Sequence, residues 1–139
     1  MRRERTITAL NFALVVAGAS AGCRADPSTA RGTAERFLDA HYVEIDLPTA
    51  LPYTSGVARE KVEKELELVK GVSIDETTFK PIVRYSLLEE RADGDGGTKF
   101  LYHGRILVDG GGGFDRRWLV TVRQETAGYR VTNYQEFAE

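Results

Sequence analysis

Few side chains in this sequence offer reactive groups. Its two histidines are His41 and His103, and its single cysteine is Cys23. His41 stands at helical spacing among aromatic residues, so it is either a base near neutral pH or a packed histidine with one hydrogen-bond partner. His103 falls on the polar side of a predicted strand, where we expect solvent around it. With so few imidazole and thiol groups, the sequence predicts no zinc-ligand cluster, and we assign no catalytic residue and no cofactor.

Three large aromatic residues stand at strand spacing in the second half of the chain: Tyr85, Tyr102 and Trp118. Each combines a large apolar ring with one polar atom, so together with His41 they are the candidate residues of a ligand pocket. The alternative is that the same rings fill the hydrophobic core. The spacing leaves both interpretations open.

The N-terminus carries the pattern of an export signal. Arginines precede an apolar stretch over residues 9–17, and small residues continue to Gly22. This order predicts a signal peptide over residues 1–22. A membrane-spanning helix needs about 20 largely apolar residues, so the stretch is too short for a permanent span.

Cys23 follows the signal directly, and two interpretations compete. Ser20-Ala21-Gly22-Cys23 resembles a bacterial lipobox, whose cysteine thiol receives a diacylglyceryl group. This resemblance implies lipid attachment at Cys23 and a membrane-anchored protein of the cell envelope. The alternative is ordinary cleavage after Ala19 or Ala21, which predicts a soluble secreted or periplasmic protein. Residues 23–28 are small and polar, so we interpret them as a tether.

The charge balance argues against a nucleic-acid partner. The chain has 19 basic and 21 acidic residues, and three of the basic and one of the acidic residues lie within residues 1–22. The remainder therefore carries 16 basic against 20 acidic residues, a net charge of −4. Phosphate backbones require clustered positive charge, so we expect no binding to nucleic acid.

Residues 29–139 are predicted to form one α+β domain that begins with helices. Helical spacing of apolar residues predicts helices over 29–44, from Leu47, and over 56–70. The expected N-terminal caps are Ser28 or Thr29, Asp46 and Ser55. In the third helix, the charged run "REKVEKELE" is interpreted as a solvated face.

The periodicity changes to two after residue 78, which predicts a meander of antiparallel strands. The strand segments are 79–91, 98–109, 115–125 and 128–137, separated by glycine-containing turns. Alternation assigns an apolar side of Phe100, Tyr102, Ile106, Val108, Trp118, Val120, Val122, Tyr129 and Val131, and the helices are expected to cover it.

Four arginines recur on the opposite, mostly polar side of these strands: Arg105, Arg117, Arg123 and Arg130. One interpretation is a surface that binds an anionic polymer or a protein partner. The other is cross-strand ion pairing with acidic neighbours, for which the expected partners are Glu89, Glu90, Glu125 and Glu136.

The order of helices and strands resembles the nuclear transport factor 2-like superfamily. "TAERFLDAHYVEIDLPTALPYTSGVAREKV" is similar to its helical half and "RRWLVTVRQETAGYRVTNYQE" to its final hairpin, within a resemblance that covers residues 28–137. It implies helices packed on a curved antiparallel sheet in a cone, and dimers through the sheet face. A signal followed directly by this domain also resembles the arrangement in small bacterial lipoproteins with the same fold.

The resemblance also bears on activity, because the superfamily's enzymes hold an acidic base and a hydrogen-bond donor inside the cone. The predicted apolar side of this sheet contains no obvious carboxylate. We therefore expect an exported, lipid-anchored envelope protein with a non-catalytic domain that binds a ligand or partner. The alternative is a small isomerase-like or cyclase-like enzyme with its active site inside the cone.

Overall fold

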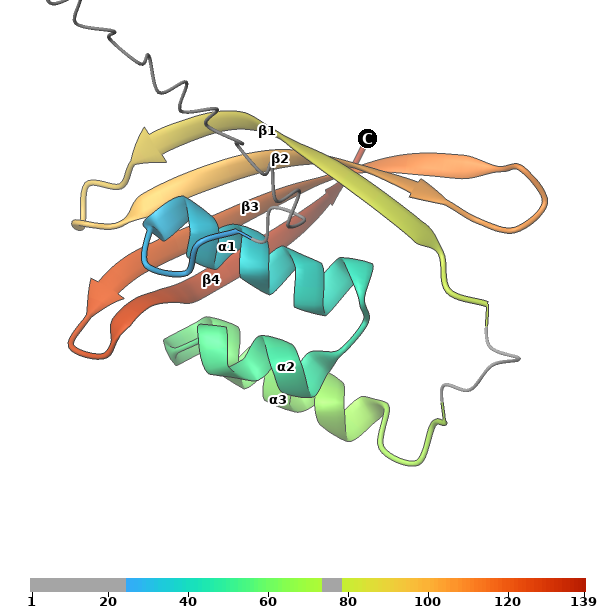
Figure 1. The fold of residues 1–139 in the computed structure, drawn as a ribbon, viewed down its shortest axis with the longest axis horizontal. Helices are drawn as coiled ribbons and strands as arrows, with labels where there is room; N and C mark the ends of the chain where they lie inside the picture. Colours follow the sequence, from blue (N-terminus) through green and yellow to red (C-terminus); the bar gives the residue numbers. More distant parts are fainter. Residues whose placement is uncertain (1–24, 74–78) are drawn as a thin grey trace, which may run out of the picture.

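The computed structural model describes residues 25–73 and 79–139 (Figure 1). The predicted signal peptide and Cys23 lie outside the described residues. Within those two ranges, no helix combines the length and the apolar composition that a membrane span requires.

The first predicted helix is divided into two helical forms. Helix α1 covers Ala30–Leu38 and begins as predicted at Thr29, whose hydroxyl oxygen accepts a hydrogen bond from the Gly32 amide. It continues into the π-helical turn η1, Asp39–Val43, in which the Glu44 amide donates to the carbonyl of Asp39. Such wide turns are rare and occur often at functional sites, and this one contains His41.

Two shorter helical turns and one longer helix follow. Helix α2 covers Leu47–Ala50, and the carboxylate of Asp46 caps it by accepting from the Thr49 amide. The 3-10 turn η2 covers Leu51–Tyr53, and helix α3 covers Gly56–Leu68.

Ser55 occupies the capping position of α3, but the prediction that its side chain caps the helix is wrong. Its hydroxyl donates to Glu125 at the end of β3, and its amide donates to the carbonyl of Val131. Both groups of Ser55 therefore connect the start of α3 to the sheet.

The predicted four-stranded meander is confirmed. Its strands are β1 (Ile82–Ala92), β2 (Thr98–Leu107), β3 (Gly113–Glu125) and β4 (Gly128–Ala138), antiparallel in the order β1-β2-β3-β4. Figure 1 shows the helices gathered on one side of the curved sheet, with α1 lying along it. The fold is therefore α+β, as predicted.

A shift of register between Thr121 and Val122 changes which residues of β4 face the helices. Val122 pairs with Val131, but Val120 pairs with Tyr134, so β4 contains one extra residue between these pairs. Residues opposite each other share a face, so Tyr134 is buried beside Val120 and Glu136 lies on the same side as Trp118.

The core lies between the helices and this face of the sheet. It includes Phe37, Leu38, Val62, Phe100, Tyr102, Trp118, Val120, Val122 and Val131, each at most 1% exposed. The predicted apolar side of the sheet is buried at most positions, but Ile106 and Tyr129 are only partly buried. Val108 is 40% exposed, because β2 ends at Leu107, so its assignment to the core is wrong.

Candidate functional site

Three of the four candidate pocket residues meet inside the cone. Tyr102 and Trp118 are fully buried, and Tyr85 contacts both with ring centroids 5.6 and 6.5 Å away. Tyr42 from η1 stacks on Trp118 with a centroid separation of 4.5 Å. The rings occupy the interior of the cone, which favours the core interpretation of the sequence pattern over the pocket.

The hydroxyl of Tyr85 connects the sheet to the helical layer. It donates to Asp39 Oδ1 over 2.6 Å, from β1 to η1. Burial raises the pKa of the Tyr85 phenol, and the nearby Asp39 carboxylate raises it further. Burial also raises the pKa of Asp39, against the opposing effect of the Tyr85 hydrogen bond. The hydroxyl of Tyr102 is buried without a hydrogen-bond partner among the described residues.

His41, the fourth candidate, faces a different place: an open groove where η1, α3 and β4 meet. We call it the α3–β4 groove, and its volume is about 600 Å³. Its lining residues are His41, Tyr42, Lys61, Glu65, Tyr134, Gln135, Glu136 and Phe137. A larger hollow follows the solvent side of α3 near Glu60 and Glu67, but it lies away from the histidine.

A carboxylate bridges two side chains in this groove. Glu65 Oε2 lies 2.6 Å from His41 Nε2, and Glu65 Oε1 accepts a 2.6 Å hydrogen bond from the Tyr134 hydroxyl. Burial alone would raise the pKa of Glu65, but the hydrogen bonds from His41 and Tyr134, together with attraction to His41 and Lys61, outweigh burial and hold its pKa below the ordinary value. Glu65 is therefore a carboxylate with both oxygens engaged.

The same bridge orients the imidazole of His41. An ionised Glu65 can only accept, so Nε2 of His41 carries the proton and Nδ1 of the neutral ring is left as an acceptor. Nδ1 is buried and has no partner among the described residues, and the side chain is only 9% exposed. His41 is therefore packed with one hydrogen-bond partner, which is the second of the two interpretations that the sequence allowed.

A second carboxylate, Glu136, lies at the edge of the groove. Glu136 Oε2 accepts a hydrogen bond from Trp118 Nε1 over 3.2 Å, and Oε1 pairs with Arg116 Nε over 3.1 Å. Burial, with the negative charges of Glu136 and Glu65, raises the pKa of Tyr42. The groove therefore holds the carboxylates of Glu65 and Glu136 near the phenol of Tyr42.

The expectation that the apolar side of the sheet lacks a carboxylate is wrong for Glu136, and α3 adds a second carboxylate, Glu65, from the helical layer. Glu65 is on the face of α3 that contains the buried Val62, although the charged run suggested a solvated face. Glu136 reaches this side through the extra residue in β4. For Glu65 the sequence offered one signal. It lies three residues after Val62, and this spacing places the two side chains on one face of a helix.

We call the side of the sheet that faces away from the helices its outer face. The four arginines predicted on this side have acidic or carbonyl partners. Arg105 pairs with Asp115 over 2.9 Å, Arg117 with Glu139, and Arg123 with Asp93 and Asp95 over 3.6 and 3.4 Å. Arg130 donates to the carbonyl of Tyr129. Pairing is present as expected, but the predicted glutamate partners are wrong for these arginines.

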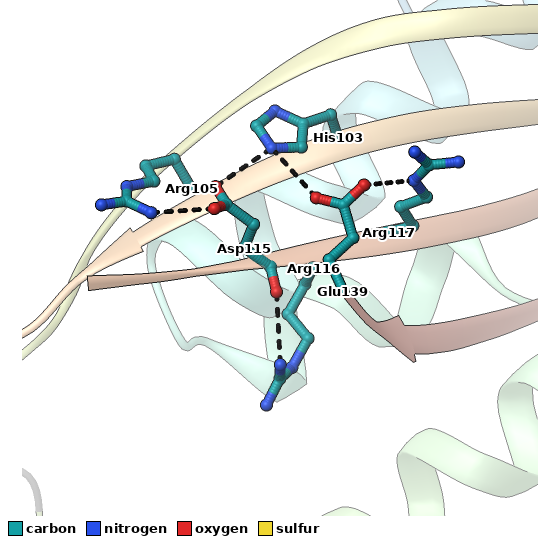
Figure 2. Close-up of polar contacts among 6 residues, drawn as sticks. All are labelled: His103, Arg105, Asp115, Arg116, Arg117 and Glu139. Carbon is teal, nitrogen blue, oxygen red and sulfur yellow. Dashed lines mark hydrogen bonds and ion pairs between the residues drawn. The ribbon is translucent and has the colours of Figure 1, made fainter.

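His103 also lies on this outer face, and its side chain is 34% exposed. It is not simply solvated, because Asp115 and Glu139 approach its Nε2 (Figure 2). These three residues are the described side chains that come together in a metal-ligand arrangement. No local sequence pattern identifies these three residues, because they come from two strands and from the residue that follows a third.

Solved structures with low sequence identity share this fold. A protein described as a calcium/calmodulin-dependent protein kinase type II association domain, from Thiobacillus denitrificans, matches with a TM-score of 0.62 and 8% identity over 81% of this chain and 96% of its own. A ketosteroid isomerase-like protein from Erwinia carotovora atroseptica matches with a TM-score of 0.54 and 15% identity over 79% and 93%.

A designed nuclear transport factor 2 protein matches with a TM-score of 0.52 and 14% identity over 79% of this chain and 97% of its own. No protein-family model matches the sequence, and no curated protein matches it. The structural likenesses establish the nuclear transport factor 2-like fold, which confirms the fold expected from the sequence. Fold alone does not define activity.

Proposed function

We propose that this chain is an exported, lipid-anchored protein of the cell envelope whose domain binds a partner without catalysing a reaction. Export and anchoring are supported by the signal pattern of residues 1–22 and by the lipobox-like position of Cys23. Two or more acyl chains hold a protein stably at a membrane, whereas one chain does so weakly.

The proposal that the domain does not catalyse a reaction is supported by the filled interior of the cone. Phe100, Tyr102 and Trp118 are all 0% exposed, and the rings of Tyr42 and Tyr85 pack against Trp118. A small-molecule site is normally a concave cavity that buries most of its ligand. Rings that occupy the interior leave surface grooves as the places for recognition.

The α3–β4 groove suits a partner better than a buried small molecule. It is open, and although the oxygens of Glu65 and Glu136 already have partners within the domain, their negative charges favour a partner segment that presents positive charge. Lys61 is already engaged, since its ammonium donates to Asn133 and to the carbonyl of Tyr134.

Trp118 provides a direct test because it is the only tryptophan in the chain. We expect blue-shifted emission that acrylamide quenches weakly, and no saturable change when a steroid or a fatty acid is added. A saturable change in Trp118 emission together with a higher Tm would show a ligand cavity at the interior rings and would overturn the proposal.

The alternative function is an isomerase-like or cyclase-like enzyme, and one observation favours it. Glu65 orients the imidazole of His41, which is the arrangement that positions a histidine as a base. Its acceptor atom Nδ1 is buried, so catalysis would require the groove to open. Hydrogen exchange of the backbone amides around His41 tests this, because an opening would give fast exchange in η1 relative to α1.

The outer face of the sheet is a second proposed interaction surface. Leu101 and Leu119 pair across β2 and β3 there and line a hollow of about 280 Å³ with Glu89, Arg91 and Lys99. Phe137, which pairs with Arg117 on the edge strand β4 and also lines the α3–β4 groove, is 45% exposed. An apolar centre with charged surroundings supports self-association or docking of a protein partner at this face.

A further inference from the structure

Three potential metal ligands converge on the outer face of the sheet. His103 Nε2 lies 3.1 Å from Asp115 Oδ1 and 3.6 Å from Glu139 Oε2, and the three atoms lie within 4.8 Å of one another. Figure 2 shows them pointing toward one another from β2, β3 and the residue after β4. All three side chains are about one third exposed, so an ion has access from solvent.

Two arginines hold the carboxylates in this orientation. Arg105 Nη1 binds Asp115 Oδ2, and Arg117 Nε binds Glu139 Oε1 (Figure 2). Each carboxylate therefore gives one oxygen to an arginine and directs the other toward His103. Hydrogen bonds from outer partners are what fix the orientation of ligands in metal sites.

A hydrogen bond from His103 explains the position of Asp115 Oδ1 but not that of Glu139 Oε2. Nε2 of His103 has at most one proton, and at 3.1 Å that proton is well placed for Asp115 Oδ1. The 3.6 Å distance to Glu139 Oε2 is too long for a hydrogen bond. Glu139 thus directs an oxygen at the histidine without receiving a hydrogen bond from it.

The two separations from His103 suit a cation placed among these atoms. Zinc binds histidine nitrogen and carboxylate oxygen at about 2.0–2.2 Å, so tetrahedral ligands lie about 3.4 Å from one another. The separations of 3.1 and 3.6 Å from His103 to the two oxygens bracket that value. One imidazole with two carboxylates is also a donor set that zinc accepts.

We propose that His103 Nε2, Asp115 Oδ1 and Glu139 Oε2 form a binding site for Zn²⁺, with Arg105 and Arg117 as the outer partners of its carboxylates. Three protein ligands leave a fourth position for water. The bound ion would connect β2, β3 and the end of β4, and would therefore stabilise the folded sheet by an amount that grows with the logarithm of the ratio of free zinc to Kd. Zinc binding would displace the proton from Nε2.

Calorimetric titration with zinc chloride tests the site, using the protein with Cys23→Ser so that no thiol competes. We expect one Zn²⁺ per chain and a higher Tm with zinc. In His103→Gln and in Asp115→Asn, the Kd should rise by more than the roughly 10–100-fold that the loss of an outer-shell partner causes. The matched control is His41→Gln, the same substitution at the other histidine, which should leave the Kd unchanged.

Nitrogen NMR of the imidazoles keeps the test decisive if a variant fails to fold. In the Cys23→Ser protein, zinc should shift the Nε2 signal of His103 and leave that of His41 in place. The proposal is overturned if the protein binds no Zn²⁺, if His103→Gln binds it equally well, or if His103 Nε2 keeps its proton in saturating zinc.

Discussion

At the scale of single residues, Glu65 is the most consequential side chain of the candidate groove. It joins His41 on η1 and Tyr134 on β4 from its place on α3, so one carboxylate connects three elements. The charged sequence around it did not reveal this role, because helical spacing places a residue on a face without showing which charge finds a partner. The hydrogen bond from Tyr134 depends on the extra residue in β4, which turns Tyr134 toward the helices.

Replacing Glu65 by alanine should destabilise the domain at pH 7 by about 1–2 kcal/mol, because two hydrogen bonds to a partly exposed carboxylate are lost. The folded-state pKa of Glu65 lies below its ordinary value of 4.5. Its contribution is therefore fully present above pH 4.5 and is lost as the pH falls through the lower folded-state pKa. Denaturant unfolding at several pH values measures the difference between the two proteins.

The matched control for this experiment is Glu63→Ala on the same helix. Glu63 is exposed and pairs only with Arg59 among the described residues, and such surface pairs contribute about 0–1 kcal/mol. An equal loss of stability in both variants, or a Glu65→Ala difference that stays constant down to pH 3, would contradict the role assigned to Glu65.

Gly104 tests the packing of the interior at one residue. A Cβ atom there would lie 2.3 Å from the ring of Trp118, which Tyr42 confines from its stacking position. Gly104→Ala should cost about 1–3 kcal/mol, as overpacking of a dense core does, and should shift the emission of Trp118. Denaturant unfolding followed by fluorescence measures both effects.

Gly94→Ala is the control, since a Cβ at Gly94 meets no atom within 4 Å. If Gly104→Ala is as stable as Gly94→Ala and leaves the Trp118 emission unchanged, the interior has free space. That result would favour a cavity in the cone.

At the scale of elements, the sequence predicted most of the fold. Helical spacing and caps located α1 and α2, and alternation located all four strands, because both signals are local. The π-helical form of η1 and the register shift in β4 depend on contacts between elements, and the sequence showed neither. These two irregularities decide where His41, Tyr134 and Glu136 lie.

The candidate site was therefore predicted only in part. The histidine was identified, but its partner Glu65 was assigned to solvent. Of the aromatic residues for which pocket and core were both open, Tyr102 and Trp118 lie in the core and Tyr85 packs against it. The same limit applies on the outer face. Arg117 was expected to pair within the sheet, yet its partner Glu139 follows the last strand.

The next prediction concerns self-association through the outer face of the sheet. If the domain self-associates there, Arg117→Glu with Arg123→Glu should raise the dissociation constant by about tenfold or more, equivalent to about 1.4 kcal/mol. The reversed charges would lie beside Glu139 and Asp93 of the same chain, so this face would become strongly negative and would repel a second copy of itself. Analytical ultracentrifugation measures the change, and circular dichroism checks that the sheet remains folded.

Arg59→Glu serves as the matched control, because Arg59 is an exposed, ion-paired arginine on α3. Association that weakens equally in this control would point to net charge instead of the sheet face. Association that survives the double reversal would place the contact elsewhere.

At the scale of the whole molecule, the domain begins close to the proposed anchor. The carbonyl of Ala25 accepts from Arg36 over 2.6 Å, and that of Pro27 accepts from the hydroxyl of Thr33. Gly32 permits this approach, since a Cβ there would lie 1.6 Å from the carbonyl oxygen of Asp26. Residues 25–28 of the predicted tether thus contact α1.

This proximity has a consequence for the proposed function. Cys23 precedes Ala25 by two residues, which span about 7 Å even when fully extended. An acylated Cys23 would therefore hold the domain directly against the membrane surface. Its binding surfaces would meet partners in the envelope at short range.

Intact mass measurement of the exported protein, beside its Cys23→Ser variant, tests the account most directly. We predict a chain that begins at Cys23 and carries diacylglyceryl mass, found in the membrane fraction, and a Cys23→Ser variant without that mass, absent from the membrane fraction. An exported wild-type chain without acyl mass that begins upstream or downstream of Cys23 would contradict the account.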